Sequence, residues 1–216
     1  MYVDIVKEPA TKLNHMNETR PRDSRKALLD AAQQLLITKG HAVITVRSVA
    51  AEAGVNHGLV RYYFETLDNL FVESFDRFTN ELLERQRALY SAEGPFIDKW
   101  RTAMGYIETE DRQSGYSKLW LEMQAMAWNR PDLQIHLQET NRQWRIILTD
   151  AFTQAMDDYG IDTDQFPIDA VVSLVFTFNL GLQIEAVGGT TDGHEALLTM
   201  IDNHLQHLEN HQPSRT

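Results

Sequence analysis

The chain has 216 residues, of which 43% are hydrophobic and 24% charged, and its formal net charge is −11 at pH 7. These proportions are typical of a globular protein with one large domain or two modest ones, and they exclude a disordered chain. The absence of cysteine excludes a disulfide scaffold, a Cys-ligated zinc site and a thiol nucleophile. The longest charge-free apolar run, 170–184, is shorter than the roughly 20 residues that cross a bilayer. The N-terminus has no apolar signal-peptide core, so we expect a cytoplasmic protein without a membrane span.

Positive charge is concentrated near the N-terminus, although the chain as a whole is acidic. Between Arg20 and Arg61, seven Lys or Arg residues stand against three Asp or Glu residues. A basic segment on an acidic body is typical of a small head that binds a polyanion, joined to a larger domain with another task. Charge counts alone leave chance clustering as an open alternative.

The N-terminal third predicts a loose tail followed by four helices. Residues 1–19 are polar and aperiodic, whereas the apolar spacing after them is helical. The predicted helices cover 24–39, 45–53, 56–63 and 66–90. The expected N-caps are Ser24, Thr45, Asn56 and Thr66, and the expected stops are Gly40 and Gly54.

The remaining two thirds predict a second, larger set of helices. Apolar residues keep a three-to-four spacing over 131–159, which predicts one long helix. The segment 168–187 is apolar almost all round, so we expect it to be covered on every side. No stretch shows the sustained alternation of a β-strand. We therefore predict an all-α protein.

Residues 45–71 contain the spacing of two short helices that meet across a tight turn. Ala50 is small enough for the crossing, Gly54 tolerates a left-handed turn, and Val60 packs back from the second helix. This is the spacing of a helix-turn-helix, whose second helix enters the major groove of DNA. Many helical hairpins share it, so a hairpin without DNA contact remains the alternative.

The continuation of the chain narrows this choice. A long helix opens at Thr66, and the residues before and after it read Thr45, Val49, Ala50, Ala53, Gly54, Val55, Asn56, Gly58, Val60, Arg61, Tyr63, Phe64 and Leu70. Over about residues 24–72 this pattern resembles the TetR family of transcriptional regulators. The resemblance implies a helix-turn-helix DNA-binding domain over 20–65 and a helical effector-binding and dimerisation domain over 66–209. Tails over 1–19 and 210–216 flank the two domains.

Some positions depart from that family's pattern. Glu65 stands at a commonly basic site, Leu67 stands where the family usually has Lys, and the usual Leu-Tyr pair is Val60-Arg61. Because two positive groups that would face phosphates are missing, we expect weak nonspecific affinity and a shallow dependence on salt. Arg61 either compensates in part or reads bases itself.

The predicted DNA contacts lie at the start of the second helix and along the third. His57 and Arg61 are the expected base readers, because arginine can hold guanine O6 and N7 bidentately. Gly58 lets the helix approach the bases, and Tyr62 is expected to be more exposed than Tyr63. The full predicted set is Arg25, Thr45, Arg47, Asn56, His57, Gly58, Arg61, Tyr62 and Tyr63. Further basic residues that form either phosphate contacts or a solvated face are Arg20, Arg22 and Lys26.

Two C-terminal segments, 168–187 and 194–207, predict how two copies pair. One head makes few contacts, so proteins of this kind bind palindromic DNA as dimers. Small residues recur every four positions in the first segment, and the resemblance places dimerisation on the last two long helices. The predicted interface residues are Ser173, Thr177, Gly181, Leu197 and Ile201. The alternative is that the small residues pack within one subunit.

The middle helices are rich in aromatic residues and methionine, which favours a pocket for an apolar or aromatic ligand. Core packing is the alternative for each residue taken alone. The predicted pocket residues are Trp100, Met104, Trp120, Met123, Gln124, Trp144, Asn179 and Gln183. Further candidates are Tyr106, Met126, Trp128, Arg142 and Gln143.

Enzyme and metal chemistry have little support in the sequence. It contains no G-x-S-x-G, no glycine-rich phosphate loop and no H-E-x-x-H. The spacing of His204, His207 and His211, with Asp202 and His194 nearby, could in principle hold a divalent metal. Histidines late in a C-terminal helix usually face water, so we predict no metal and no cofactor there.

The sequence-based interpretation is a homodimeric repressor that binds a palindromic operator in double-stranded DNA and is released by a small effector molecule. The alternatives are a helical ligand-binding or protein-interaction module and a small helical enzyme.

Overall fold

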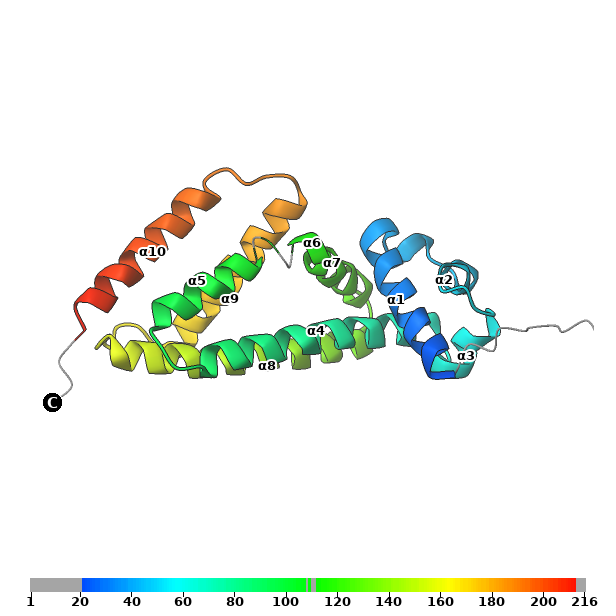
Figure 1. The fold of residues 1–216 in the computed structure, drawn as a ribbon, viewed down its shortest axis with the longest axis horizontal. Helices are drawn as coiled ribbons and strands as arrows, with labels where there is room; N and C mark the ends of the chain where they lie inside the picture. Colours follow the sequence, from blue (N-terminus) through cyan, green and yellow to red (C-terminus); the bar gives the residue numbers. More distant parts are fainter. Residues whose placement is uncertain (1–20, 108, 110–111, 213–216) are drawn as a thin grey trace, which may run out of the picture.

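The computed structural model describes residues 21–107, 109 and 112–212, and its regular structure in these ranges is helical, which confirms the all-α prediction. The elements are α1 (Pro21–Lys39), the 3₁₀ turn η1 (His41–Val43), α2 (Val46–Glu52), α3 (Gly58–Phe64), α4 (Leu67–Ser91), α5 (Phe96–Tyr106), α6 (Arg112–Ser114), α7 (Tyr116–Ala127), α8 (Pro131–Asp158), α9 (Ile168–Val187) and α10 (His194–Asn210) (Figure 1). The predicted tail over 1–19 lies outside the described residues.

The N-terminal helices begin and end close to the predicted signals, with two corrections, of which the first is that the N-cap of α3 is His57 and not Asn56. α1 begins at Pro21, because proline lacks only an N–H that has no partner in a first turn. The predicted N-cap at Ser24 is therefore wrong, and Ser24 is buried inside the helix. Thr45 and Thr66 cap α2 and α4 as predicted, since the hydroxyl of each accepts a backbone N–H three residues on at 3.1 Å.

α4 and α8 lie side by side along the length of the molecule, with α1–α3 at one end (Figure 1). Toward the N-terminal helices, Ser74 Oγ of α4 donates to the Leu29 carbonyl oxygen at 3.1 Å. Toward α8, Arg130 pairs with Asp68 and His136 with Asp76, each at 2.6 Å. α4 is therefore held to the N-terminal helices and to the C-terminal body at once.

The buried side chains form two clusters. The first joins α1–α4 to α7 and the start of α8, with Leu28, Val49, Phe75 and Leu119 at its centre. The second joins α5 to the end of α8, with α9 and α10 resting on it. Because the first cluster continues across residue 65, packing alone does not separate the two predicted domains there.

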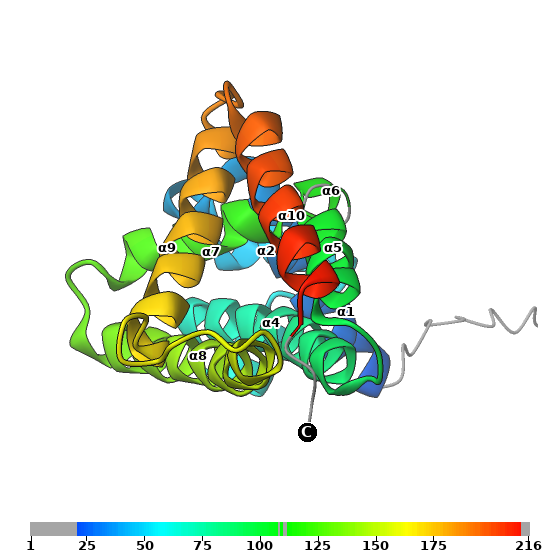
Figure 2. The ribbon, with the colours of Figure 1, turned by 90° about the vertical axis from the view of Figure 1, so that its left-hand side faces the viewer.

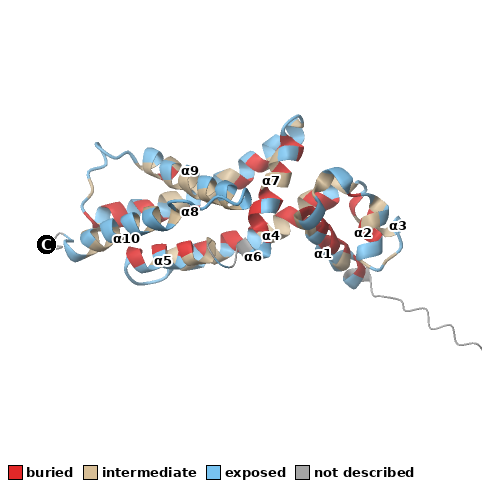
Figure 3. Cartoon of the chain, turned by 90° about the horizontal axis from the view of Figure 1, so that it is seen from above, coloured by how far each residue is buried: buried red, intermediate tan, exposed pale blue. Residues whose placement is uncertain are grey.

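α9 and α10 are poorly covered by the rest of the described chain. Seen end-on, they rise from the base formed by α4 and α8 toward a common apex (Figure 2). In α9 only Val172 is buried, and α10 has no buried residue (Figure 3). The prediction that 168–187 is covered on every side is therefore wrong within one subunit, because one face of α9 has no neighbouring element to cover it.

By length and composition alone, α9 could cross a bilayer. The mean hydropathy of its most apolar 18 residues is 1.6, and 11% of these residues are buried. The sequence expectation counted only the charge-free run, whereas the helix includes Asp169 and Glu185 near its ends. Core helices of soluble proteins meet the same criterion, so it is weak evidence for a span.

Candidate nucleic-acid interface and ligand pocket

α2 and α3 form the predicted helix-turn-helix. The turn between them contains Gly54 at φ 66°, in the left-handed region that favours glycine. The Val55 N–H donates to the Ala50 carbonyl oxygen at 2.9 Å and closes the turn. Ala50 and Val60 are buried where the helices cross. The small residue, the turn glycine and the branched residue therefore take the places that their spacing predicted.

α3 presents an exposed polar face above a buried one. His57, Arg61 and Tyr62 are exposed, and Tyr62 is exposed to 76%, whereas Val60 and Phe64 are buried. Tyr63 is half-buried and meets the Phe64 ring edge-on at 6.2 Å, so the predicted difference between the two tyrosines is present. The buried face fixes α3 on the core and leaves the exposed side chains free to meet a partner.

Two predicted contacts are used for helix capping. Asn56 Oδ1 accepts the Gly58 N–H at 2.8 Å, which satisfies a donor at the start of α3. Thr45 and Ser48 form a reciprocal capping box at the start of α2. Arg47 is exposed beside it. Asn56 and Thr45 therefore position the two helices, whatever else they contact.

Arg25 is exposed at the surface of α1 and makes two contacts within the chain. Its guanidinium bonds the Glu73 carboxylate and lies 5.2 Å from the centre of the Phe64 ring. These contacts tie α1 to α3 and α4, and the predicted DNA contact of Arg25 stays a prediction. Lys26 pairs with Asp30 on its own helix at 2.7 Å. Arg20 and the side chain of Arg22 lie outside the described part of the chain.

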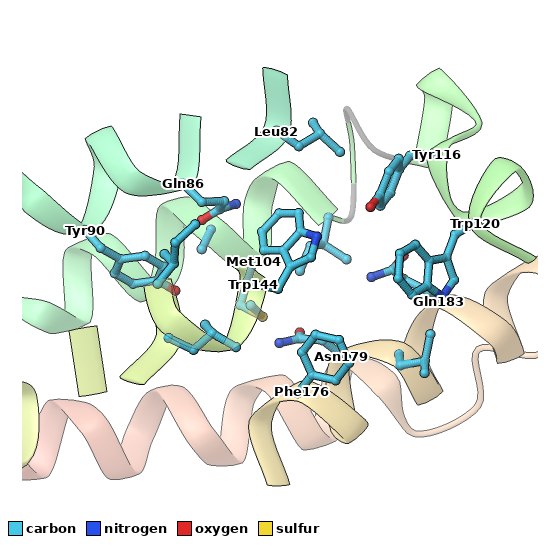
Figure 4. A pocket seen from close by; sticks show the side chains of 15 residues that line it. Leu82, Gln86, Tyr90, Met104, Tyr116, Trp120, Trp144, Phe176, Asn179 and Gln183 are labelled. Atoms are coloured by element: carbon cyan, nitrogen blue, oxygen red, sulfur yellow. The ribbon is translucent and has the colours of Figure 1, made fainter. Parts of the chain in front are cut away.

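A cavity of about 100 Å³ lies between α4, α5, α7, α8 and α9 (Figure 4). Five aromatic rings line it, from Tyr90, Tyr116, Trp120, Trp144 and Phe176. The other lining side chains are the amides Gln86, Asn179 and Gln183 and the apolar Leu82, Ala103, Met104, Ile107, Ile147, Leu148 and Leu180. Burial raises the pKa of Tyr90, so its hydroxyl stays protonated at neutral pH.

Five of the eight predicted pocket residues line this cavity: Met104, Trp120, Trp144, Asn179 and Gln183. Trp100 does not, because it packs in the second core cluster, and Met123 is completely buried in the first. Gln124 lies beside Trp128 in a separate surface hollow, and Trp128 is 79% exposed. Among the further candidates, Arg142 and Gln143 bond Glu139 on their own helix. Periodicity had placed these residues on the correct helices, but it did not distinguish faces that meet a cavity from faces that meet a core.

The sequence interpretation missed the contribution of α4 and the aromatic residues Tyr116 and Phe176. Leu82, Gln86 and Tyr90 recur every four residues on α4 and line the cavity. The available signal was Gln86, a long polar residue that proves to be buried on α4.

α7 lies between the cavity and the N-terminal helices. Tyr116 and Trp120 line the cavity, whereas Glu122 on the same helix accepts the His41 backbone N–H at 2.7 Å and lies 2.6 Å from His41 Nδ1. At Gly115, before α7, a Cβ would stand 2.5 Å from the Ile37 side chain, so α1 and the start of α7 approach closely. A movement of α7 around a bound molecule would therefore displace the end of α1 by direct contact.

The described residues contain no group of three or more His, Cys, Asp or Glu side chains that could hold a metal ion. In the C-terminal helix, His207 and His211 stack with ring centres 4.2 Å apart, and His211 Nδ1 contacts the His207 carbonyl oxygen. Asp202 instead pairs with Arg101 of α5 at 2.6 Å.

Comparison with known proteins supports the N-terminal unit most strongly. The sequence profile described as "Bacterial regulatory proteins, tetR family" matches residues 28–73. The HTH-type transcriptional regulator BetI 1 of Chromohalobacter salexigens is 28% identical over 123 residues, which cover 56% of this chain and 60% of the relative. The HTH-type transcriptional repressor Rv3405c of Mycobacterium tuberculosis is 36% identical over 74 residues, 34% of this chain and 39% of the relative. The chain thus spans less than two thirds of either relative.

Solved structures share the fold over most of the chain. A structure from Rhodococcus sp., described as a TetR-family transcriptional regulator, has a TM-score of 0.67 and 23% identity, covering 86% of this chain and 96% of that one. A transcriptional-regulator structure from Saccharomonospora viridis in complex with choline has a TM-score of 0.70 and 17% identity, covering 88% and 95%. The matched profile makes residues 28–73, with the helix-turn-helix built as predicted, similar to the N-terminal unit of the tetR family of bacterial regulatory proteins, and the chain shares the fold of these solved structures.

Proposed function

We propose that this protein is a DNA-binding transcriptional regulator that acts as a homodimer on a palindromic operator. The observation that carries the proposal is the exposed face of α3, with His57, Arg61 and Tyr62 on a helix whose other face is buried. A helix of this kind fits the major groove, and arginine and histidine can bond base edges there. Arg47 at the start of α2 is the proposed backbone contact, with Gly58 allowing close approach.

The homodimer is supported by the open face of α9. Leu174, Thr177, Gly181 and Ile184 are exposed at helical spacing, and Leu174 is exposed to 71%. Exposing such an apolar stripe to water is unfavourable in free energy, and its small residues allow a second copy to pack closely against it. On α10, Thr199, Met200 and Asn203 are exposed in the same way.

The other predicted interface residues divide between the two sides of these helices. Ser173 Oγ accepts a hydrogen bond from Arg145 Nη1 at 3.0 Å, which occupies it within the subunit. Ile201 packs on the second core cluster, so it supports α10 from behind. Leu197 is half-buried. The proposed interface therefore keeps Thr177 and Gly181 and moves on α10 from Ile201 toward Met200.

A lined cavity and a long shared helix support control by a small molecule. α4 lines the cavity with Leu82, Gln86 and Tyr90, and its first half packs on α1. A ligand that fits one position of α4 better than another shifts the equilibrium between two separations of the paired heads. We propose that ligand binding favours the separation that does not match the operator and so releases DNA. A relative described as a repressor supports this direction, and action on bacterial DNA implies the cytoplasm.

Selection of random double-stranded oligonucleotides on the full chain tests the proposal. We expect enrichment of palindromes that bind two chains per site, with an affinity that falls as salt rises. No enrichment at low ionic strength would instead favour a ligand-binding or protein-interaction module, and turnover of a small substrate would favour an enzyme.

The Arg61→Ala variant tests the proposed base reader. Loss of a bidentate arginine should cost about 1–3 kcal/mol at one operator position and relax specificity there. Arg87→Ala, an exposed arginine near the other end of α4, is the matched control and should bind as the wild type does. Equal loss on all sequences would make Arg61 a phosphate contact.

A further inference from the structure

We propose that the cavity binds an uncharged molecule of about one ring that donates a hydrogen bond to Asn179. This inference rests on the proposed ligand-responsive function and specifies the class of ligand. It follows from three properties of the cavity: its lack of charge, its size and one unsatisfied oxygen.

The cavity wall carries no ionised side chain among its lining residues. The guanidinium groups next to it face elsewhere. Arg145 lies 5.0 Å from the centre of the Phe176 ring and donates to Ser173, and Arg85 lies 4.2 Å from the centre of the Tyr106 ring. The ring faces would attract a cation, but both of these positive charges would repel it and the wall has no carboxylate to offset them.

An anion also fits this wall poorly. Ring faces carry the negative part of the aromatic quadrupole, and rings make up a large share of the lining. The lining offers only neutral donors, so a carboxylate would lose its water without gaining an ionic hydrogen bond. An uncharged ligand avoids both costs.

The size of the cavity limits the ligand to a small molecule. Its volume is about 100 Å³. An apolar cavity of about 150 Å³ in another protein holds benzene, so this smaller cavity takes no more than one ring. Aromatic side chains that line the cavity suit such a ring by offset or edge-to-face packing.

One polar atom in the wall lacks a partner. Asn179 Oδ1 is buried without a hydrogen bond from the described residues, and Asn179 lies among the cavity side chains in Figure 4. The neighbouring Gln183 Oε1 already accepts the Ser117 hydroxyl at 2.9 Å. A buried carbonyl oxygen left unpaired is costly, so a ligand O–H or N–H directed at it binds better than an apolar analogue.

Calorimetry of the full chain with five probes tests the proposal. The probes are benzyl alcohol, toluene, benzoate, benzylammonium and choline. We expect benzyl alcohol to bind at least tenfold more tightly than each of the other four. Equal binding of toluene would overturn the role of Asn179. Tighter binding of either cation or of benzoate would overturn the assignment to uncharged ligands. No binding of benzyl alcohol would overturn the assignment to a ligand of about one ring.

Variants at one position separate the hydrogen bond from packing. Asn179→Ala should reduce benzyl alcohol to the affinity of toluene, and Asn179→Asp should improve benzylammonium at least tenfold by adding a carboxylate. Asn80→Ala, at an exposed asparagine of α4, is the matched control and should change neither. Unchanged benzyl alcohol affinity in Asn179→Ala would overturn the assignment.

These measurements use the protein without DNA, so they are separable from the regulator function. Binding of benzyl alcohol by a chain that ignores DNA would contradict the proposed function and leave the ligand class intact. A chain that binds a palindrome but none of the probes would contradict the ligand class alone.

Discussion

The N-terminal helices and the α9–α10 layer use apolar residues in opposite ways. In the N-terminal unit, Leu28, Val49, Val60 and Phe64 are buried within the subunit. In α9 and α10, large apolar side chains such as Leu174, Ile184 and Met200 face outward. The first region buries its apolar side chains, together with those of α7 and the start of α8, and exposes polar groups, whereas the second leaves its apolar face open.

This difference indicates which kind of partner each region suits. Exposed His57 and Arg61 on a finished core suit a polar, charged surface such as DNA. An open apolar face on α9 suits a matching apolar surface, such as a second copy of the same helix.

Phe64 and Tyr62, two nearby aromatic residues of α3, differ in burial and therefore test the N-terminal core. Phe64→Ala should lower the free energy of unfolding by about 3–5 kcal/mol, because Phe64 is buried under Arg25 and leaves a cavity. Tyr62→Ala, at an exposed position, should leave it within about 0.5 kcal/mol. Urea unfolding measures both. A similar loss in the two variants would show that Phe64 is not part of a buried core.

A charge on the open face of α9 should separate the proposed dimer. Leu174→Glu should weaken association by about 2 kcal/mol or more, since it places a charge at the centre of an apolar contact. Analytical ultracentrifugation measures the dimer fraction. Ile135→Glu is the matched control, because Ile135 is a similarly exposed apolar residue on α8. Equal dissociation in both variants, or none in Leu174→Glu, would refute α9 as the interface.

The contact between His41 and Glu122 joins the N-terminal helices to α7. Glu122→Gln keeps an acceptor for the His41 N–H but removes the charge, so we expect a loss of about 1 kcal/mol in the free energy of unfolding. Glu139→Gln, on an exposed pair with Arg142, serves as the control and should have no measurable effect. If both variants unfold like the wild type, the contact between α7 and the N-terminal helices does not depend on the charge of Glu122.

The smallest effect concerns pH at the α4–α8 contact. The Asp76 hydrogen bond raises the pKa of His136 above 6.5, against an opposing effect of burial. A raised histidine pKa stabilises the fold fully below the ordinary value of 6.5, and this stabilisation is lost as pH rises through the raised pKa.

Comparing the wild type with His136→Gln over a range of pH tests that linkage. The difference in the free energy of unfolding should be largest below pH 6.5, at no more than about 1 kcal/mol for a part-exposed pair, and should shrink as pH rises. A difference that grows with pH would contradict the assigned direction.

Local sequence signals predicted the N-terminal unit well. Gly54 in the turn, Thr45 and Thr66 as caps, and the exposure of Tyr62 above Tyr63 all followed from residue type and spacing. The start of α1 was the exception, because a first-turn proline extended the helix beyond the cap signal at Ser24.

The pocket and the open face depended on tertiary structure. Helical periodicity identifies an apolar stripe but not what covers it, so Met123 was misassigned to the cavity and α9 was expected to be covered. The contribution of α4 became visible only once α5, α7, α8 and α9 were placed around Gln86. Caps, turns and helix periods are set by neighbours in the chain, whereas cavities and unpaired faces are set by which helices meet, and that depends on contacts between residues far apart in sequence.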